Sequence, residues 1–153
     1  MSTIEQRLRT LGLELPPLQA PVANYVRTVR TGNLVFVAGH LPVKDGEIVY
    51  RGKVGRDLDV GAGYEAARLV MLNCLAALKE ELGSLDRVRR VVKLLGMVNS
   101  APDFTDQPKV INGASDLLVQ LYGERGRHAR SAVGMSALPL GASVEIEMIV
   151  EVE

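Results

Sequence analysis

Apolar and acidic residues alternate along the last part of the chain. The even positions from 144 to 152 are apolar, and the odd positions 145, 147, 151 and 153 are glutamates. Because successive side chains of a β-strand point to opposite faces, this period of two predicts a strand with one apolar and one acidic face. Residues 131–137 are also compatible with a strand, and the Pro-Gly turn at 138–141 is short enough to pair the two as a hairpin.

Two longer segments have the spacing of amphipathic helices. The first is expected to run from an Asp59 cap to a Gly83 stop. The second is expected to begin at Thr105 or Asp106 and to end at Gly123. In both segments apolar residues recur about every 3.6 positions, so each helix has one face to bury.

Shorter patterns complete the expected order of elements. A capping box at residues 2–5 predicts a short N-terminal helix, and the prolines after it impose an extended connection, so that the two together occupy residues 1–20. Further strands, of which the third is a short edge strand, are expected at residues 25–30, 34–38, 48–54 and 88–98.

The resulting order is one helix followed by β-β-β-α-β-α-β-β. Two amphipathic helices can then cover one face of a mixed β-sheet, so the predicted fold class is an α+β two-layer sandwich. On the other face the fourth strand keeps Val91, Leu95 and Met97, which is more apolar than a solvated face. An uncovered apolar face suggests a subunit interface, and we expect a closed homo-oligomer.

Composition narrows the class of protein. With 153 residues, 47% of them apolar, we expect one domain spanning residues 1–153 with a buried core. The apolar runs are too short to span a membrane, and the first residues lack the apolar core of a signal peptide, so we expect a cytoplasmic protein. The 18 acidic and 18 basic residues cancel, so no overall field attracts nucleic acid.

Cysteine and histidine are scarce. Cys74 is the single cysteine and falls on the apolar stripe of the first long helix, which indicates a buried, inert thiol. His40 and His128 are the two histidines, too few for a multi-histidine metal site.

Arg130 and Glu145 are the first candidates for chemistry. In the predicted hairpin they lie on neighbouring strands, so a fixed cation and a fixed carboxylate share one region of the sheet. Such a pair on rigid strands suits a small anionic substrate. The alternative is a surface ion pair beside a solvated acidic face, and the residues alone leave it open.

Several segments resemble the reactive-intermediate deaminase family, also called RidA or YjgF. They are Asn24-Tyr25-Val26, residues 32–42, the two long helices with Asn112, His128-Ala129-Arg130-Ser131, Leu138-Pro139 and Val144-Glu145-Ile146-Glu147. The resemblance covers about residues 25–150, and the N-terminal helix lies outside the shortest family members. It implies a chorismate-mutase-like sandwich that assembles as a homotrimer with clefts between subunits.

The resemblance also implies hydrolysis of 2-imino acids and their enamine tautomers to 2-keto acids and ammonia. Arg130 would hold the substrate carboxylate, and Glu145 would orient a water toward the imine carbon, helped by a backbone carbonyl near Ala132. The residues that match the lining of the family's cleft are Tyr25, Gly39 and Asn112. The implied partners are the other subunits and a small carboxylate-bearing ligand in the clefts, and no metal or organic cofactor is implied.

Other interpretations stay open for these residues. Tyr25 could be a packing residue with a surface hydroxyl, and Gly39 could serve the backbone conformation only. Asn112 lies off the apolar stripe, and without the resemblance we would expect it to be solvated. Glu147 shares the strand face of Glu145, so the alternation cannot choose between them and only the resemblance selects Glu145.

His128 lies close to Arg130 in sequence, and we expect it to pair with Glu124 rather than to act as a general acid. Departures from residues common in the family occur at His40, Ala132 and Gly134, where many members carry Gln, Cys and a carboxylate. These departures put the substrate range, and turnover itself, in question.

Two other functions compete with deamination. A non-catalytic binding protein would keep the Arg130 clamp for a carboxylate ligand without a productive water. A ribonuclease would use the basic run around residues 125–130, but aromatic residues are only 4% of the chain and the net charge is zero. The sequence therefore favours deamination, and it does not name the substrate.

Overall fold

The computed structural model describes residues 2–18, 20–21 and 23–153, so Met1 and Gln19 of the expected N-terminal segment, together with Val22, lie outside the described residues. A five-stranded sheet has the order β1-β2-β7-β5-β6. Its strands are β1 (Thr28–Thr31), β2 (Leu34–His40), β7 (Val144–Val152), β5 (Val88–Asn99) and β6 (Ala129–Met135). Only the β5–β6 pair is parallel, so the sheet is mixed.

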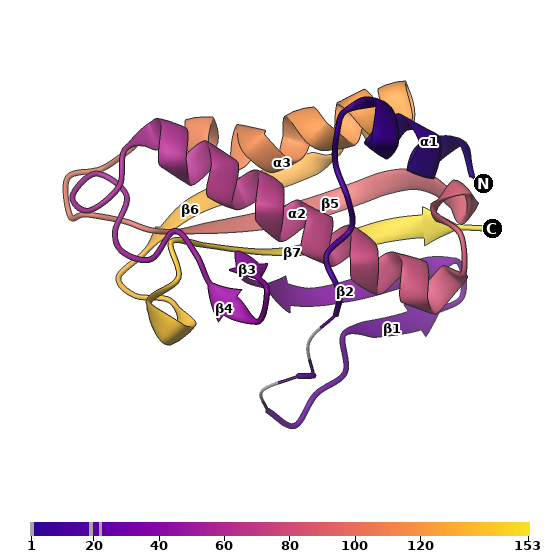
Figure 1. Ribbon diagram of the computed structural model, residues 1–153, viewed down its shortest axis with the longest axis horizontal. Helices are drawn as coiled ribbons and strands as arrows, with labels where there is room; N and C mark the ends of the chain where they lie inside the picture. Colours follow the sequence, from indigo (N-terminus) through magenta and orange to yellow (C-terminus); the bar gives the residue numbers. More distant parts are fainter. Residues whose placement is uncertain (1, 19, 22) are drawn as a thin grey trace.

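Two long helices, α2 (Val60–Leu82) and α3 (Gln107–Tyr122), cover one face of this sheet and make the second layer of the α+β sandwich (Figure 1). Asp59 caps α2 by accepting a hydrogen bond from the Ala62 amide at 2.8 Å, and Gly83 ends the helix at φ 81°. For α3 the N-cap is Asp106, but its side chain makes no capping hydrogen bond. The predicted bounds of both helices are confirmed.

The N-terminal helix α1 (Thr3–Thr10) begins at the predicted capping box, where the Ser2 hydroxyl accepts from the Glu5 amide at 3.0 Å. Ile4 and Leu8 of this helix are buried, whereas Leu11, just after its end, is exposed. The connection after α1 crosses the outside of α2 (Figure 1), where Leu13 and Leu15 pack against the core.

The predicted hairpin between residues 131–137 and the last strand is wrong. β5 lies between β6 and β7, pairing parallel with β6 and antiparallel with β7. The segment between β6 and β7 instead forms a short 3₁₀ turn, Pro139–Gly141. Because β5, α3 and β6 follow one another in the chain, the parallel pair is closed by a helical crossover.

The edge strand expected at residues 48–54 is also wrong. Of these residues, Ile48 belongs to a short hairpin formed by β3 (Val43–Lys44) and β4 (Glu47–Ile48). This hairpin is separate from the main sheet. Residues 49–54 make only isolated bridges, one of them between Arg51 and Ala142. Asp45 and Gly46, both at positive φ, form the tight turn between β3 and β4, as is common for Asp-Gly pairs in two-residue hairpin turns.

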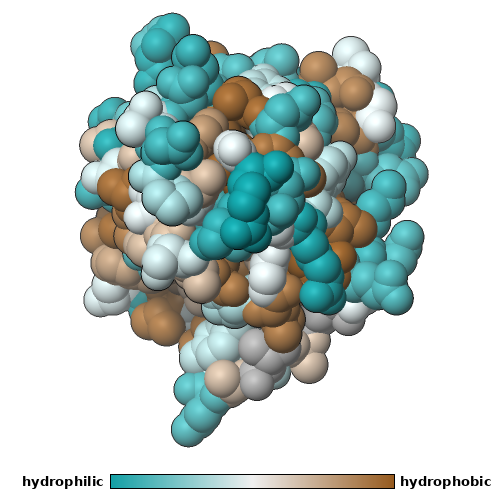
Figure 2. Space-filling model, turned by 90° about the vertical axis from the view of Figure 1, so that its left-hand side faces the viewer, coloured by the Kyte–Doolittle hydropathy of each residue, from teal (hydrophilic) through white to brown (hydrophobic). Residues whose placement is uncertain are grey.

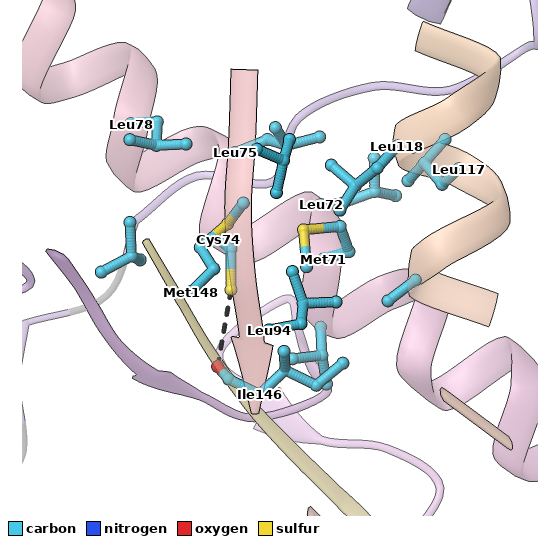
Figure 3. Close-up of a cluster of buried hydrophobic side chains, with 14 of the residues drawn as sticks. Met71, Leu72, Cys74, Leu75, Leu78, Leu94, Leu117, Leu118, Ile146 and Met148 are labelled. Atoms are coloured by element: carbon cyan, nitrogen blue, oxygen red, sulfur yellow. Dashed lines mark hydrogen bonds between the residues drawn. The ribbon is translucent and has the colours of Figure 1, made fainter. Parts of the chain in front are cut away.

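The core fills the space between the helices and the sheet. Figure 3 shows Cys74 of α2 among apolar side chains, with its Sγ 3.6 Å from the Ile146 carbonyl oxygen of β7. The thiol is fully buried, as predicted, and burial raises its pKa. At the end of the molecule where the loops before α2 and α3 gather, hydrophobic and hydrophilic residues are interspersed (Figure 2).

Among the described residues, no helix lies over the other face of the sheet. Phe36, Val133, Leu95 and Met97 remain partly or largely accessible there, as expected of an apolar face. The expected place of Val91 is wrong: it is buried in the core opposite Val150, because a register shift between Val91 and Lys93 reverses the side of the sheet that the later residues of β5 face. No helix in the described ranges is long and apolar enough to cross a membrane.

Candidate functional site

Arg130 lies on the edge strand β6 beside Leu94 of β5, so its side chain points to the helix-covered side of the sheet. There its guanidinium donates three hydrogen bonds to α3. Nη1 donates to Asn112 Oδ1 at 2.9 Å and to Ser115 Oγ at 3.0 Å, and Nη2 donates to the Pro108 carbonyl at 3.1 Å. The three acceptors stand four and three residues apart, which is the spacing of one helix face.

A guanidinium carries five N–H donors in a planar fork. The three bonds to α3 account for three of them, and within the described residues Arg130 has no carboxylate partner. Two donors therefore remain for a ligand, and two parallel N–H groups match the two oxygens of one carboxylate. Asn112 is accordingly a partner of Arg130, not the solvated residue that the sequence alone suggested.

His128 joins the same cluster. Its Nε2 lies 2.9 Å from Ser115 Oγ, and its Nδ1 lies 2.7 Å from the Gly126 carbonyl oxygen. The expected pairing with Glu124 is wrong, because Glu124 pairs instead with Arg127 at 3.0 Å on the surface. Burial is the main cause that lowers the pKa of His128, and the charge of Arg130 lowers it further.

Glu145 lies on β7, on the face of the sheet that the helices leave open. Its carboxylate rests against the backbone of Gly39 on β2, where a Cβ would collide with Glu145 Oε2. Gly39 is therefore required for close approach of a side chain, not for its backbone dihedrals. Burial raises the pKa of Glu145, with a smaller contribution from Glu147, which is exposed on the same strand. Glu145 is therefore partly buried and Glu147 is exposed, although both lie on the same face of β7.

Tyr25 and His40 line a small cavity of about 110 Å³ next to Gly39. Tyr25 is 45% exposed, and burial lowers the pKa of His40, whose Nδ1 lies 2.7 Å from the Ala38 carbonyl oxygen. Asn73 of α2 lines the same cavity, where its side-chain amide donates to the carbonyl oxygens of Leu41 and Val43.

The six predicted residues therefore fall into two groups within one protomer. Arg130, Asn112 and Ala132 belong to β6 and α3, and Ala132 packs partly buried against the core two residues beyond Arg130. Tyr25, Gly39 and Glu145 belong to the region around β2 and β7. Arg130 pairs with Leu94 of β5 and Glu145 pairs with Met97 of β5, and these two β5 positions face opposite sides of the sheet.

Sequence reasoning missed Ser115 and predicted the wrong partner for His128. The one available signal was spacing, because Ser115 follows Asn112 by three residues and so shares its helix face. The described residues contain no cluster of three or more histidine, cysteine or acidic side chains that could hold a metal ion.

Comparison with known proteins decides the family. Residues 5–152 match the family described as "YjgF/chorismate_mutase-like, putative endoribonuclease". The chain belongs to this YjgF family. The match extends into α1, beyond the residues 25–150 that carry the resemblance in the sequence.

Individual proteins can be aligned with this chain over most of its length. Protein TCP17 of Trypanosoma cruzi is 46% identical over 97% of this chain and 93% of its own length. A crystal structure from Shewanella oneidensis, titled a putative endoribonuclease, is 36% identical with a TM-score of 0.95, covering 99% of this chain and 100% of the other. RidA from a Psychrobacter species is 28% identical with a TM-score of 0.62, covering 90% and 94%.

Proposed function

We propose that this protein hydrolyses 2-imino acids and their enamine tautomers to 2-keto acids and ammonia, in clefts between the subunits of a homotrimer. Arg130 of one subunit holds the substrate carboxylate, and Glu145 of the next activates the water. The observation that carries the proposal is the state of Arg130, which is fastened to α3 by three hydrogen bonds and keeps two donors for an anion.

The separation of the two groups of residues supports an assembled site. Arg130 lies on an edge strand, and Glu145 lies on the open, partly apolar face of the same sheet. A second copy that covers this face could bring its own edge strand next to Glu145, completing a site that one protomer leaves divided. Tyr25, Gly39 and the small cavity would lie on the Glu145 side, and Asn112 and Ala132 on the Arg130 side.

The reaction requires little beyond positioning. The carboxylate of the substrate binds Arg130, which places the C=N bond near Glu145. Glu145 accepts a proton from water as the water oxygen attacks the imine carbon, and it returns this proton to the nitrogen to give a carbinolamine. Glu145 then accepts the proton of the carbinolamine hydroxyl and passes it to the nitrogen as the carbon–nitrogen bond breaks, so that ammonia leaves and the 2-keto acid remains. The raised pKa of Glu145 suits a group that must take up and return a proton near neutral pH.

The names of the relatives point two ways. One matched structure is titled RidA and another a putative endoribonuclease. The zero net charge favours a small carboxylate over RNA. A carboxylate-binding protein without turnover would use the same Arg130 group.

The test is release of ammonia and 2-keto acid from freshly generated 2-imino acids of different side-chain size, measured alongside sedimentation of the purified protein. We expect turnover and a trimer at micromolar concentration. A monomer would contradict the shared cleft. A trimer that binds 2-keto acids but releases no ammonia would identify a binding protein, and cleavage of RNA without deamination would identify a nuclease.

A further inference from the structure

The donor and the acceptor can be assigned in each hydrogen bond around Ser115. The Gly126 carbonyl oxygen can only accept, so His128 Nδ1 carries the proton of that contact. In the neutral ring Nε2 is then an acceptor, and burial together with Arg130 favours this neutral form by lowering the pKa of His128. The Ser115 hydroxyl must therefore donate to Nε2, which leaves its lone pairs to accept from Arg130.

This chain of bonds fixes a hydroxyl that could otherwise rotate. A free serine hydroxyl can turn its proton toward any acceptor, and its proton would then compete with the Arg130 donor for the same space. With the proton committed to His128, Ser115 offers Arg130 a lone pair in a constant place. The adjacent acceptors, Asn112 Oδ1 and the Pro108 carbonyl, complete three anchors on one helix face.

We propose that Ser115 and His128 are positioning residues that hold the Arg130 guanidinium in one plane, so that its two remaining donors select a single planar carboxylate. The inference rests on the proposed function, because it assigns the ligand of that site as a 2-oxo or 2-imino acid bound through one carboxylate. Neither residue touches the substrate in this arrangement. Both act through Arg130.

The same pair also has the separation of a nucleophile and its base, 2.9 Å between oxygen and nitrogen. The bond from Arg130 argues against that role, because a cationic donor takes one of the two lone pairs of the hydroxyl and lowers the electron density, and so the nucleophilicity, of its oxygen. The geometry therefore suits a support for the guanidinium better than a covalent site.

The experiment measures binding of 2-oxobutanoate and of inorganic phosphate to the full chain by calorimetry. The variants are Ser115→Ala, Ser115→Thr and His128→Ala, with Gln120→Ala as a matched control on an exposed position of α3. We expect Ser115→Ala and His128→Ala to weaken 2-oxobutanoate binding by about tenfold or more, as for the loss of a hydrogen bond to a charged group. Phosphate can bind a cationic group in many orientations, so the variants should lose less affinity for phosphate than for 2-oxobutanoate. The preference of the site for the carboxylate over phosphate should therefore decrease.

Ser115→Thr keeps the hydroxyl and should restore both affinity and preference, which a purely structural defect would not explain. Equal affinities in wild type, Ser115→Ala and His128→Ala would overturn the inference while leaving the proposed function intact. Wild-type binding of 2-oxobutanoate without deamination would remove the proposed reaction and leave the inference standing. No 2-oxobutanoate binding by the wild type would contradict both the inference and the proposed function. Stoichiometric labelling of Ser115 by a sulfonyl fluoride would contradict its positioning role.

Discussion

Arg130 lies on the helix-covered side of the sheet and gives three hydrogen bonds to α3, whereas Glu145 lies on the open side and receives none from the described residues. The guanidinium is held in place by the hydrogen bonds that it donates to a single helix. The carboxylate is held by close packing against Gly39 and by partial burial. The same sheet thus carries a cation, Arg130, that is largely satisfied by hydrogen bonds and an anion, Glu145, that is not.

The difference suits two different tasks. A guanidinium with several fixed partners keeps its plane, which favours recognition of a ligand. A half-buried carboxylate without donors has a raised pKa and exchanges its proton more readily near neutrality. Binding is therefore expected to depend on the Arg130 side of the site, and turnover on the Glu145 side.

The largest expected effect comes from Glu145→Gln. Loss of the proton acceptor should lower imine hydrolysis by about 10²–10⁴-fold, while 2-oxobutanoate binds nearly as before. Glu147→Gln is the matched control, because Glu147 is exposed two residues along the same strand face and should be nearly neutral. Steady-state ammonia release and calorimetry would measure the two quantities. Similar losses of turnover in both variants would remove the distinction between the two glutamates.

Arg130→Ala should act on binding instead. Loss of a charged hydrogen-bonding partner in a partly desolvated site costs about 2–5 kcal/mol of ligand affinity. Arg130→Lys keeps the charge but loses the planar fork, so it should fall between wild type and Arg130→Ala. Arg127→Ala removes a neighbouring cation from a surface ion pair and is the control.

Affinity for 2-oxobutanoate, measured for folded and assembled variants, would check this order. Full affinity in Arg130→Ala would contradict the clamp. A mild Arg130→Lys effect combined with steep weakening by salt would favour phosphate recognition, as expected of an RNA-binding site.

Gly39→Ala should disturb the Glu145 side alone. The added Cβ would meet the Glu145 carboxylate and force it to move, at a cost of about 1–3 kcal/mol. Turnover should fall more than affinity for 2-oxobutanoate. The effect should also be non-additive with Glu145→Asp, because a shorter side chain leaves room for the methyl group. Strict additivity in this double-mutant cycle would show that Gly39 acts elsewhere.

Local patterns were enough to predict the elements but not their neighbours. The residues that begin and end α2 and α3 can be recognised from the residues next to them in the sequence. The alternation along β7 indicates which of its side chains are buried. The placement of β5 between β6 and β7 depends on long-range pairing, which no local pattern contains. The hairpin therefore failed although both of its strands were correctly expected.

The candidate site shows the same limit. The resemblance to a family selected Arg130 and Glu145, but their position on opposite sides of the sheet follows from the parallel register of β5 and β6. Asn112 and Ser115 became partners of Arg130 because the α3 crossover lays its polar edge over β6. Side-chain spacing marked that edge in the sequence, yet nothing there indicated which strand it would meet.

The smallest expected effect is on stability, and its sign depends on pH. Because the folded-state pKa of Glu145 is raised above its ordinary value of 4.5, the folded chain holds this proton more tightly than the unfolded chain. The contribution of Glu145 to stability is therefore fully present below about pH 4.5 and is lost as pH rises through the folded-state pKa. Glu145→Gln cannot ionise, so it should unfold at a slightly higher temperature than wild type at pH 7.

This advantage should shrink as the pH is lowered and vanish once the wild-type carboxyl is protonated in both states. Both histidines also titrate with lowered pKa values, but they are present in wild type and variant and cancel in the difference. Thermal melts of wild type, Glu145→Gln and Glu147→Gln between pH 4 and 7 would measure it. A Glu145→Gln protein less stable than wild type at pH 7 would mean that the carboxylate has a stabilising cation in the assembled protein. In that case the contrast between a satisfied Arg130 and an unsatisfied Glu145 would hold only for the isolated protomer.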